Sequence, residues 1–196
     1  MKLFGQKSLS TAISWLLLLL FVIIAFHTVY QLVGFTVCYY NLKTGSHLFP
    51  ETFYVGDSIE WGGKIVQEKL YFRFKYPFSD QQMLTGIFSL NTFLNHLFQN
   101  VFFCLFFFFA YKIFNGMSKE ILFNRDVIKW LRKFSWTNIL YMPVYIIICL
   151  FVFNLGLDGM MLTTCLFLLF LGIMVYFIME FFKKGLELQN QADLTI

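Results

Sequence analysis

Four long stretches without a charged side chain constrain this chain more than any other feature of its sequence. They cover residues 11–34, 83–111, 134–157 and 159–179. A helix needs about 20 such residues to cross the hydrocarbon layer of a bilayer, and a span without water has to satisfy its own backbone groups. The sequence therefore predicts an all-α integral membrane protein, a single membrane domain over residues 1–196. Its transmembrane helices are expected at residues 11–34, 83–114, 134–157 and 159–182.

Composition supports a lipid environment. Hydrophobic residues make up 59% of the 196 residues, charged residues make up 13%, and the mean hydropathy is +0.68. A water-soluble monomer is excluded, because so few charges cannot cover its surface. The net charge of +4 is too weakly clustered for a nucleic-acid-binding protein. The four cysteines, three of them within apolar stretches, do not form a disulfide framework.

The distribution of Lys and Arg predicts the orientation in the membrane. Of the 15 basic residues, two precede the first uncharged stretch, six lie between the second and third stretches, and two follow the fourth, whereas the turn between the third and fourth contains only Asp158. Basic connections stay in the cytoplasm. Both termini are therefore expected there, and the loop at residues 38–82 outside. The bulky residues 27–32 provide no small-residue cleavage site, so the first span is expected to be a retained anchor.

The external loop at residues 38–82 has the pattern of a small β-sheet. Residues 69–76 alternate apolar and polar side chains, which is typical of a half-buried strand. Gly62 and Gly63 lie between two further short runs and predict a tight hairpin. A loop of this length is too short for an independent core. The sheet is therefore expected to pack on the helices, and its aromatic residues to anchor it at the membrane interface or to bind a ligand.

The second span carries a stripe of polar side chains in its first turns. Asn91, Asn95 and Gln99 recur every four residues, and Thr92, His96 and Asn100 repeat this spacing one position later. One interpretation is that the stripe packs on protein. Polar side chains at the end of the first span are then its expected partners: His27, Thr28 and Gln31.

The alternative interpretation of the polar stripe is the wall of a wet cavity or of a substrate path, because polar groups inside a membrane often mark function. His27 and His96 are expected at similar depth, where they form a candidate pH-sensitive pair. Two histidines without a third ligand do not make a metal site. The sequence therefore predicts no metal.

Residues 117–133 form a basic connection that runs into the third span. Asn124 is expected to cap a helix that begins at Arg125. Its apolar arc contains Val127, Ile128, Trp130, Leu131 and Phe134. Four cations lie on its polar arc: Arg125, Lys129, Arg132 and Lys133. We expect this basic face to lie on the anionic inner leaflet, and the alternative is a surface for a cytoplasmic partner.

Two blocks of sequence carry a resemblance to a known family. The first is the tail, residues 183–196, with the preceding Phe182: it contains Phe-x-Lys-Gly, then Leu-x-Leu-Gln, and ends in Asp-Leu-Thr-Ile. The second is residues 117–136, with the capped helix and its Leu-Arg-Lys sequence. Both blocks resemble the bacterial membrane family called domain of unknown function 2975. The resemblance implies a four-span protein of the bacterial inner membrane, sometimes encoded beside a helix-turn-helix regulator, and it implies no catalytic or binding residues.

The sequence contains no residue pattern typical of catalysis. We recognise neither a carboxylate pair nor a catalytic set of a Ser or Cys with a His, and Glu180 is expected to pair with Lys183 and Lys184. We therefore predict a protein that is not an enzyme and has no cofactor. Its expected role is that of a sensor or an accessory partner of a transcriptional regulator, and its expected partners are anionic lipid, that regulator or further copies of the chain. The alternative is a small oligomeric transporter or pore component lined by the polar stripe.

Overall fold

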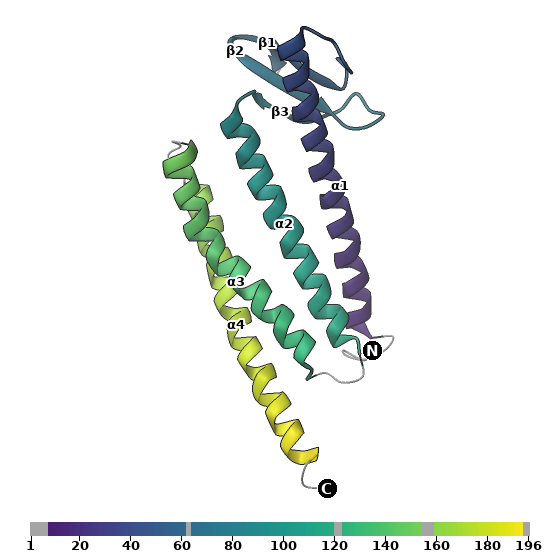
Figure 1. Ribbon diagram of the computed structural model, residues 1–196, viewed down its shortest axis with the longest axis vertical. Helices are drawn as coiled ribbons and strands as arrows, with labels where there is room; N and C mark the ends of the chain where they lie inside the picture. Colours follow the sequence, from purple (N-terminus) through teal and green to yellow (C-terminus); the bar gives the residue numbers. More distant parts are fainter. Residues whose placement is uncertain (1–7, 62–63, 120–122, 154–158, 194–196) are drawn as a thin grey trace. The chain divides into compact units, whose positions relative to one another are not determined.

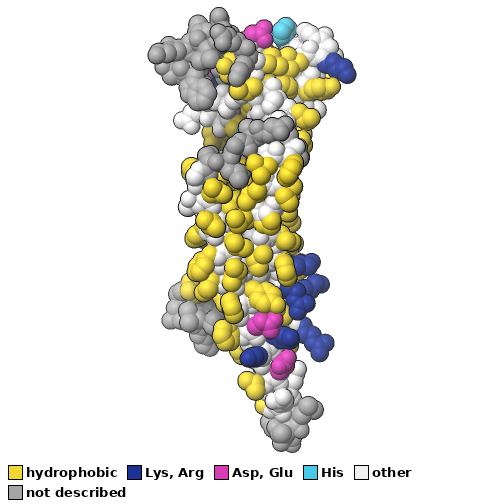
Figure 2. All heavy atoms as spheres, turned by 90° about the vertical axis from the view of Figure 1, so that its left-hand side faces the viewer, with side chains coloured by type: hydrophobic (Ala, Val, Ile, Leu, Met, Phe, Trp, Pro, Cys, Tyr) yellow, Lys and Arg dark blue, Asp and Glu magenta, His cyan; other side chains and the backbone are white. Residues whose placement is uncertain are grey.

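The computed structural model contains four long helices and one small sheet (Figure 1). It describes residues 8–61, 64–119, 123–153 and 159–193. All four long helices are long and apolar enough to cross a membrane, which confirms four candidate spans. On the face drawn in Figure 2, hydrophobic side chains cover most of the helical surface, and Lys and Arg side chains gather below them. The helices and the strands are, in chain order, α1 (Leu9–Thr44), β1 (Phe53–Trp61), β2 (Lys64–Lys75), β3 (Gln82–Ile87), α2 (Leu90–Met117), α3 (Arg125–Ile147), the π-helical η1 (Ile148–Phe153) and α4 (Gly159–Asp193).

The chain divides into two compact units. The sheet unit contains Ala25–Asn100, and the helical unit contains Met1–Ile24 and Val101–Ile196. The division falls within α1 and within α2, so each unit contains part of both helices.

The sheet unit contains the expected antiparallel sheet, with strand order β1-β2-β3. Phe53 pairs with Phe74 across β1 and β2, and Phe74 pairs with Leu84 across β2 and β3. The predicted strand at residues 69–76 is the second half of β2. Trp61 pairs with Lys64, as a hairpin requires, but the turn predicted at Gly62 and Gly63 lies outside the described residues.

Aromatic side chains fix the sheet on α1. Phe72 and Phe74 are completely buried, and their rings lie 4.9 and 5.0 Å from the ring of Phe35. The Tyr30 hydroxyl donates to the carbonyl oxygen of Lys75 at 2.8 Å. A Cβ atom on Gly34 would lie 2.9 Å from the rings of Phe53 and Phe74, so glycine permits this close approach. The expectation that the sheet packs on a helix is therefore confirmed.

The structure corrects two predicted helix ends beside the sheet. The first helix extends to Thr44, beyond its predicted end at residue 34, and Gly45 with a φ of +67° follows it. The second helix begins at Leu90, so its predicted start at residue 83 is wrong. Residues 82–87 lack charged side chains, as a span does, but they form β3 and pair with β2. The Ser89 Oγ then accepts a hydrogen bond from Thr92 N at 3.1 Å and caps α2.

In the helical unit, α3 and α4 approach each other closely at Gly172. A Cβ atom on this residue would lie 2.7 Å from Ile139 Cγ1 and 3.0 Å from the carbonyl oxygen of Ser135. The Ser135 Oγ donates to the Gly172 carbonyl oxygen at 2.8 Å. Ser135 and Asn138 are completely buried in α3. Small residues allow this packing, as is usual between membrane helices.

The basic segment is the first part of a continuous helix. Asn124 caps α3 as predicted, since its Oδ1 accepts from Val127 N at 2.9 Å. A helix lying on the membrane surface would bury its apolar arc in lipid, but this arc packs on protein. Val127 and Leu131 are buried, and both belong to a core with Ile113 of α2 and Met179 of α4. Because the basic segment continues without a break into the rest of α3, its apolar arc faces α2 and α4 and is buried against them.

Candidate functional site

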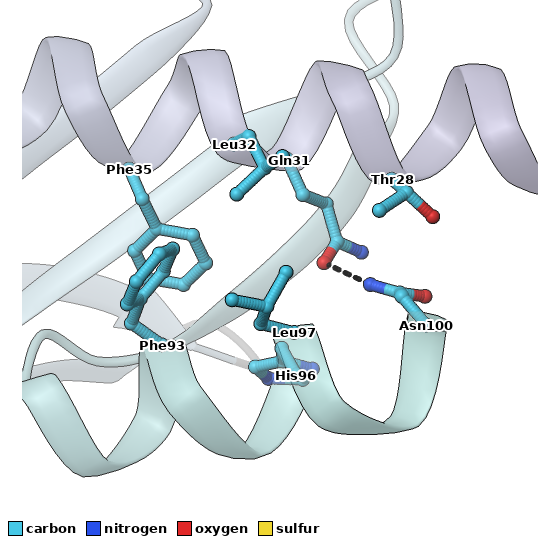
Figure 3. Close-up of a pocket in the computed structure, with 8 residues that line it drawn as sticks. All are labelled: Thr28, Gln31, Leu32, Phe35, Phe93, His96, Leu97 and Asn100. Atoms are coloured by element: carbon cyan, nitrogen blue, oxygen red, sulfur yellow. Dashed lines mark hydrogen bonds between the residues drawn. The ribbon is translucent and has the colours of Figure 1, made fainter. Parts of the chain in front are cut away.

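Facing turns of α1 and α2 in the sheet unit bring polar side chains together, and Figure 3 shows the bond between Gln31 and Asn100. The Asn100 Nδ2 donates to Gln31 Oε1 at 2.7 Å. The Gln31 amide nitrogen lies 2.7 Å from His27 Nε2 and donates to it. His27 Nε2 therefore acts as the acceptor, which places the proton of the neutral imidazole on Nδ1. We call His27, Gln31, His96 and Asn100 the polar cluster.

A cavity of about 10 Å³ is lined by three members of the polar cluster, Gln31, His96 and Asn100. This volume corresponds to about one water molecule. Phe35 and Phe93 close one side, with their ring centroids 5.2 Å apart. The remaining lining residues are Thr28, Leu32 and Leu97. The cluster has the polar groups and the space to bind one water molecule.

The predicted polar stripe is divided between two rows. His96 and Asn100 face α1 and line the cavity, as the packing interpretation predicts. In the other row, Gln99 Nε2 donates to Asn95 Oδ1 at 3.2 Å within α2, and Asn91 is exposed. The six residues therefore do not share one environment.

Breaking the pair between Asn100 and Gln31 should lower the stability of the sheet unit. In Asn100→Leu, the buried Gln31 Oε1 loses its donor, and we expect a loss of about 1 kcal/mol, within the range of up to about 1.7 kcal/mol measured for polar pairs between membrane helices. The measurement is a double-mutant cycle with Gln31→Leu, using unfolding free energies in bicelles. Thr36→Val is the control, because the Thr36 hydroxyl donates within its own helix, to the Leu32 carbonyl. A coupling energy of zero contradicts the prediction.

A larger groove of about 460 Å³ lies at the end of α1 beside β1. Its walls include Phe53 and Tyr54 of β1, and Ser46 and His47 of the preceding loop. Asn41 holds this loop, since its Oδ1 accepts from Leu48 N at 3.0 Å and its Nδ2 donates to the Leu48 carbonyl at 2.9 Å. No sequence pattern indicated this groove, because its walls come from a helix end, a loop and a strand that meet only in the folded structure.

One ion pair lies at the edge of the sheet. The Lys75 Nζ is 2.8 Å from Asp80 Oδ1, and this charged hydrogen bond lowers the pKa of Asp80 below its usual value. A lowered carboxyl pKa contributes stability above the unfolded-state pKa, and this contribution is lost as the pH falls through the folded-state pKa. Asp80 is fully exposed, so solvent screens the pair.

The predicted basic residues of α3 are exposed, and two of them lie around the same aromatic ring as a lysine of α2. Arg125, Lys129, Arg132 and Lys133 all reach the surface. Lys129 and Lys133 lie over the ring of Trp130, together with Lys112 of α2. The pattern of α3 alone could not indicate Lys112, because this lysine belongs to α2. Glu180 and Lys183 are paired at 3.9 Å, as predicted.

The described residues hold no arrangement of three or more His, Cys, Asp or Glu side chains suited to a metal ion. Comparison with known proteins provides no relative on which to base a role for these sites. No family model matches the chain, and neither the curated proteins nor the solved structures give a match.

Proposed function

We propose that the chain is a sensor or accessory protein of the bacterial inner membrane, with both termini in the cytoplasm and the loop that contains the sheet outside. The observation that carries this proposal is the attachment of the sheet, with its groove, to α1. Phe72 and Phe74 are buried against Phe35 of this helix, so a movement of the sheet also moves α1. With 36 residues, α1 is about 54 Å long, well beyond the roughly 30 Å of hydrocarbon.

The groove supports a sensing role more than a transport role. Its volume of about 460 Å³ is within the range of small-molecule sites, and its walls combine aromatic rings with a few polar groups. The polar cluster has room for only about one water molecule. A transcriptional regulator is the cytoplasmic partner that we propose, on the basis of the resemblance to domain of unknown function 2975.

The orientation can be tested by cysteine labelling. In a variant whose native cysteines are replaced, a membrane-impermeant maleimide should label Ser79→Cys in intact cells. Arg132→Cys should react only after the cells are permeabilised, because basic connections stay in the cytoplasm. Labelling of Arg132→Cys in intact cells contradicts the proposed orientation.

The sensing role can be tested with a groove variant. A strain that lacks the protein is complemented with the wild-type chain, with Tyr54→Ala or with the exposed control Phe78→Ala. If the groove receives the signal, Tyr54→Ala should reproduce the transcript changes of the deletion at normal protein levels. Phe78→Ala should restore the wild-type pattern. A deletion that changes the uptake of a solute without changing transcripts favours the transporter instead.

A further inference from the structure

Three lysine ammonium groups converge on one indole ring in the helical unit. The Nζ atoms of Lys112 and Lys129 lie 5.8 Å from the centroid of the Trp130 ring, and that of Lys133 lies 4.6 Å from it. Lys112 comes from α2, whereas the other two come from adjacent turns of α3. Cations at these distances are attracted to the face of an aromatic ring. We call these three lysines and Trp130 the lysine cluster.

Aromatic packing holds the lysine cluster in place. The ring of Trp130 is half-buried and lies 5.8 Å from the rings of Phe108 and Phe109. Lys112 also lies 5.4 Å from the centroids of the Phe108 and Tyr111 rings. The site therefore consists of a fixed aromatic floor with cations around it.

The described part of the chain provides no carboxylate within ion-pair distance of these three lysines. The nearby Asp126 lies 3.9 Å from Lys119 Nζ instead, and Glu180 pairs with Lys183. Like charges around one ring repel one another. Binding of an anion relieves this repulsion, so the cluster favours an anionic ligand.

An exposed apolar stripe continues from the lysine cluster along α3. Trp136, Leu140, Val144 and Ile147 follow Lys133 at helical spacing on the same face and are between 41% and 55% exposed. From Lys133 to Ile147 the stripe is about 21 Å long, more than half the thickness of the hydrocarbon layer. A ligand with a negatively charged head and an apolar chain matches both parts of this surface.

We propose that Lys112, Lys129 and Lys133 bind the phosphate of an anionic phospholipid, whose acyl chain lies along the apolar stripe of α3. This site goes beyond the proposed function, because it does not depend on a signal or a regulator. It also differs from general attraction between a basic helix and an anionic surface. Lys112 of α2 belongs to the site, whereas the equally basic Arg125 and Arg132 lie outside the cluster around Trp130.

Fluorescence quenching can measure the binding of lipid to this site. The probe is the full chain with Trp130 as its single tryptophan, the other three being replaced by Phe, in nanodiscs that contain brominated phosphatidylglycerol or brominated phosphatidylcholine. We expect stronger quenching by the anionic lipid at equal content. Lys112→Gln should reduce this preference about fivefold, since one cation near an anionic surface contributes on the order of 1 kcal/mol. Equal quenching by the two lipids in the unchanged site overturns the proposal.

Charge-matched controls separate the site from general attraction. The double variant Lys129→Gln/Lys133→Gln should lose the preference, whereas Arg125→Gln/Arg132→Gln, which removes the same charge from the same helix, should change it by about twofold or less in physiological salt. If both double variants lose the preference for anionic lipid to the same extent, the lysines do not form a defined site. Inorganic phosphate added in millimolar amounts should leave the quenching unchanged. If it abolishes the preference, the ligand is a soluble phosphate, and the lipid assignment is wrong.

Discussion

Truncation of Phe72 to alanine is expected to destabilise the sheet unit more than any other single change considered for this chain. Phe72 is completely buried, with the rings of Phe35 and Phe74 at 4.9 and 4.8 Å. The loss of a buried phenylalanine side chain costs about 3–5 kcal/mol, because it removes apolar contacts and leaves a cavity. In Phe72→Ala, the amide protons of β2 should therefore exchange with deuterium much faster than in the wild-type chain.

The control for Phe72→Ala is the same truncation at an exposed position. Phe78 lies in the turn before β3 and is fully exposed, so Phe78→Ala should leave the exchange of β2 within experimental error. The exchange of α4 should remain unchanged in both variants, because α4 belongs to the helical unit. If β2 exchanges equally slowly in Phe72→Ala and the wild-type chain, the aromatic core does not hold the sheet.

The second large effect is expected where α3 and α4 approach each other. In Gly172→Ala, the new methyl group would lie 2.9 Å from the backbone nitrogen of Ile139 and 3.0 Å from the carbonyl oxygen of Ser135. Backbone atoms cannot give way locally, so the helices must separate and the hydrogen bond from Ser135 Oγ must lengthen. Overpacking of this kind costs about 1–3 kcal/mol, which exceeds the gain in helix propensity of up to about 1 kcal/mol.

Gly159→Ala is the matched control for Gly172→Ala. Gly159 is also in α4, but a Cβ atom there would contact nothing within 4 Å. Unfolding in bicelles with increasing SDS should show a lower midpoint for Gly172→Ala and an unchanged or slightly higher midpoint for Gly159→Ala. A higher midpoint for Gly172→Ala would mean that α3 and α4 tolerate a wider spacing.

The sequence predicted those features of the fold that depend on local chemistry. The uncharged stretches identify four candidate spans, the alternation from Lys69 to Tyr76 identifies β2, and Asn124 identifies the start of α3. Local chemistry was not enough to predict β3. Residues 82–87 are as uncharged as a span, and only their pairing with β2 makes them a strand. The buried position of Val127 likewise depends on residues far away along the chain.

Helical spacing predicted part of the polar cluster, but not the lysine cluster or the groove. The spacing of His96 and Asn100 on α2 identified a polar face, and Gln31 was named as a partner for it, which the hydrogen bond between Asn100 and Gln31 confirms. The position of Lys112 could not be predicted, because its role depends on how closely α2 approaches Trp130. The groove beside Asn41 forms between a loop, a helix end and a strand, and no periodic pattern marks such a surface.

The short junction between β3 and α2 affects the order in which the chain assembles. Only Phe88 and Ser89 separate the end of β3 from the start of α2. During synthesis, β1 and β2 can pair before the second span exists, which leaves one edge of β2 with unpaired backbone groups. This edge is a site for pairing with other chains until β3 covers it. Because β3 directly precedes α2, insertion of the second helix anchors β3 close to the edge of β2, and it thereby limits the time during which this edge is open to aggregation.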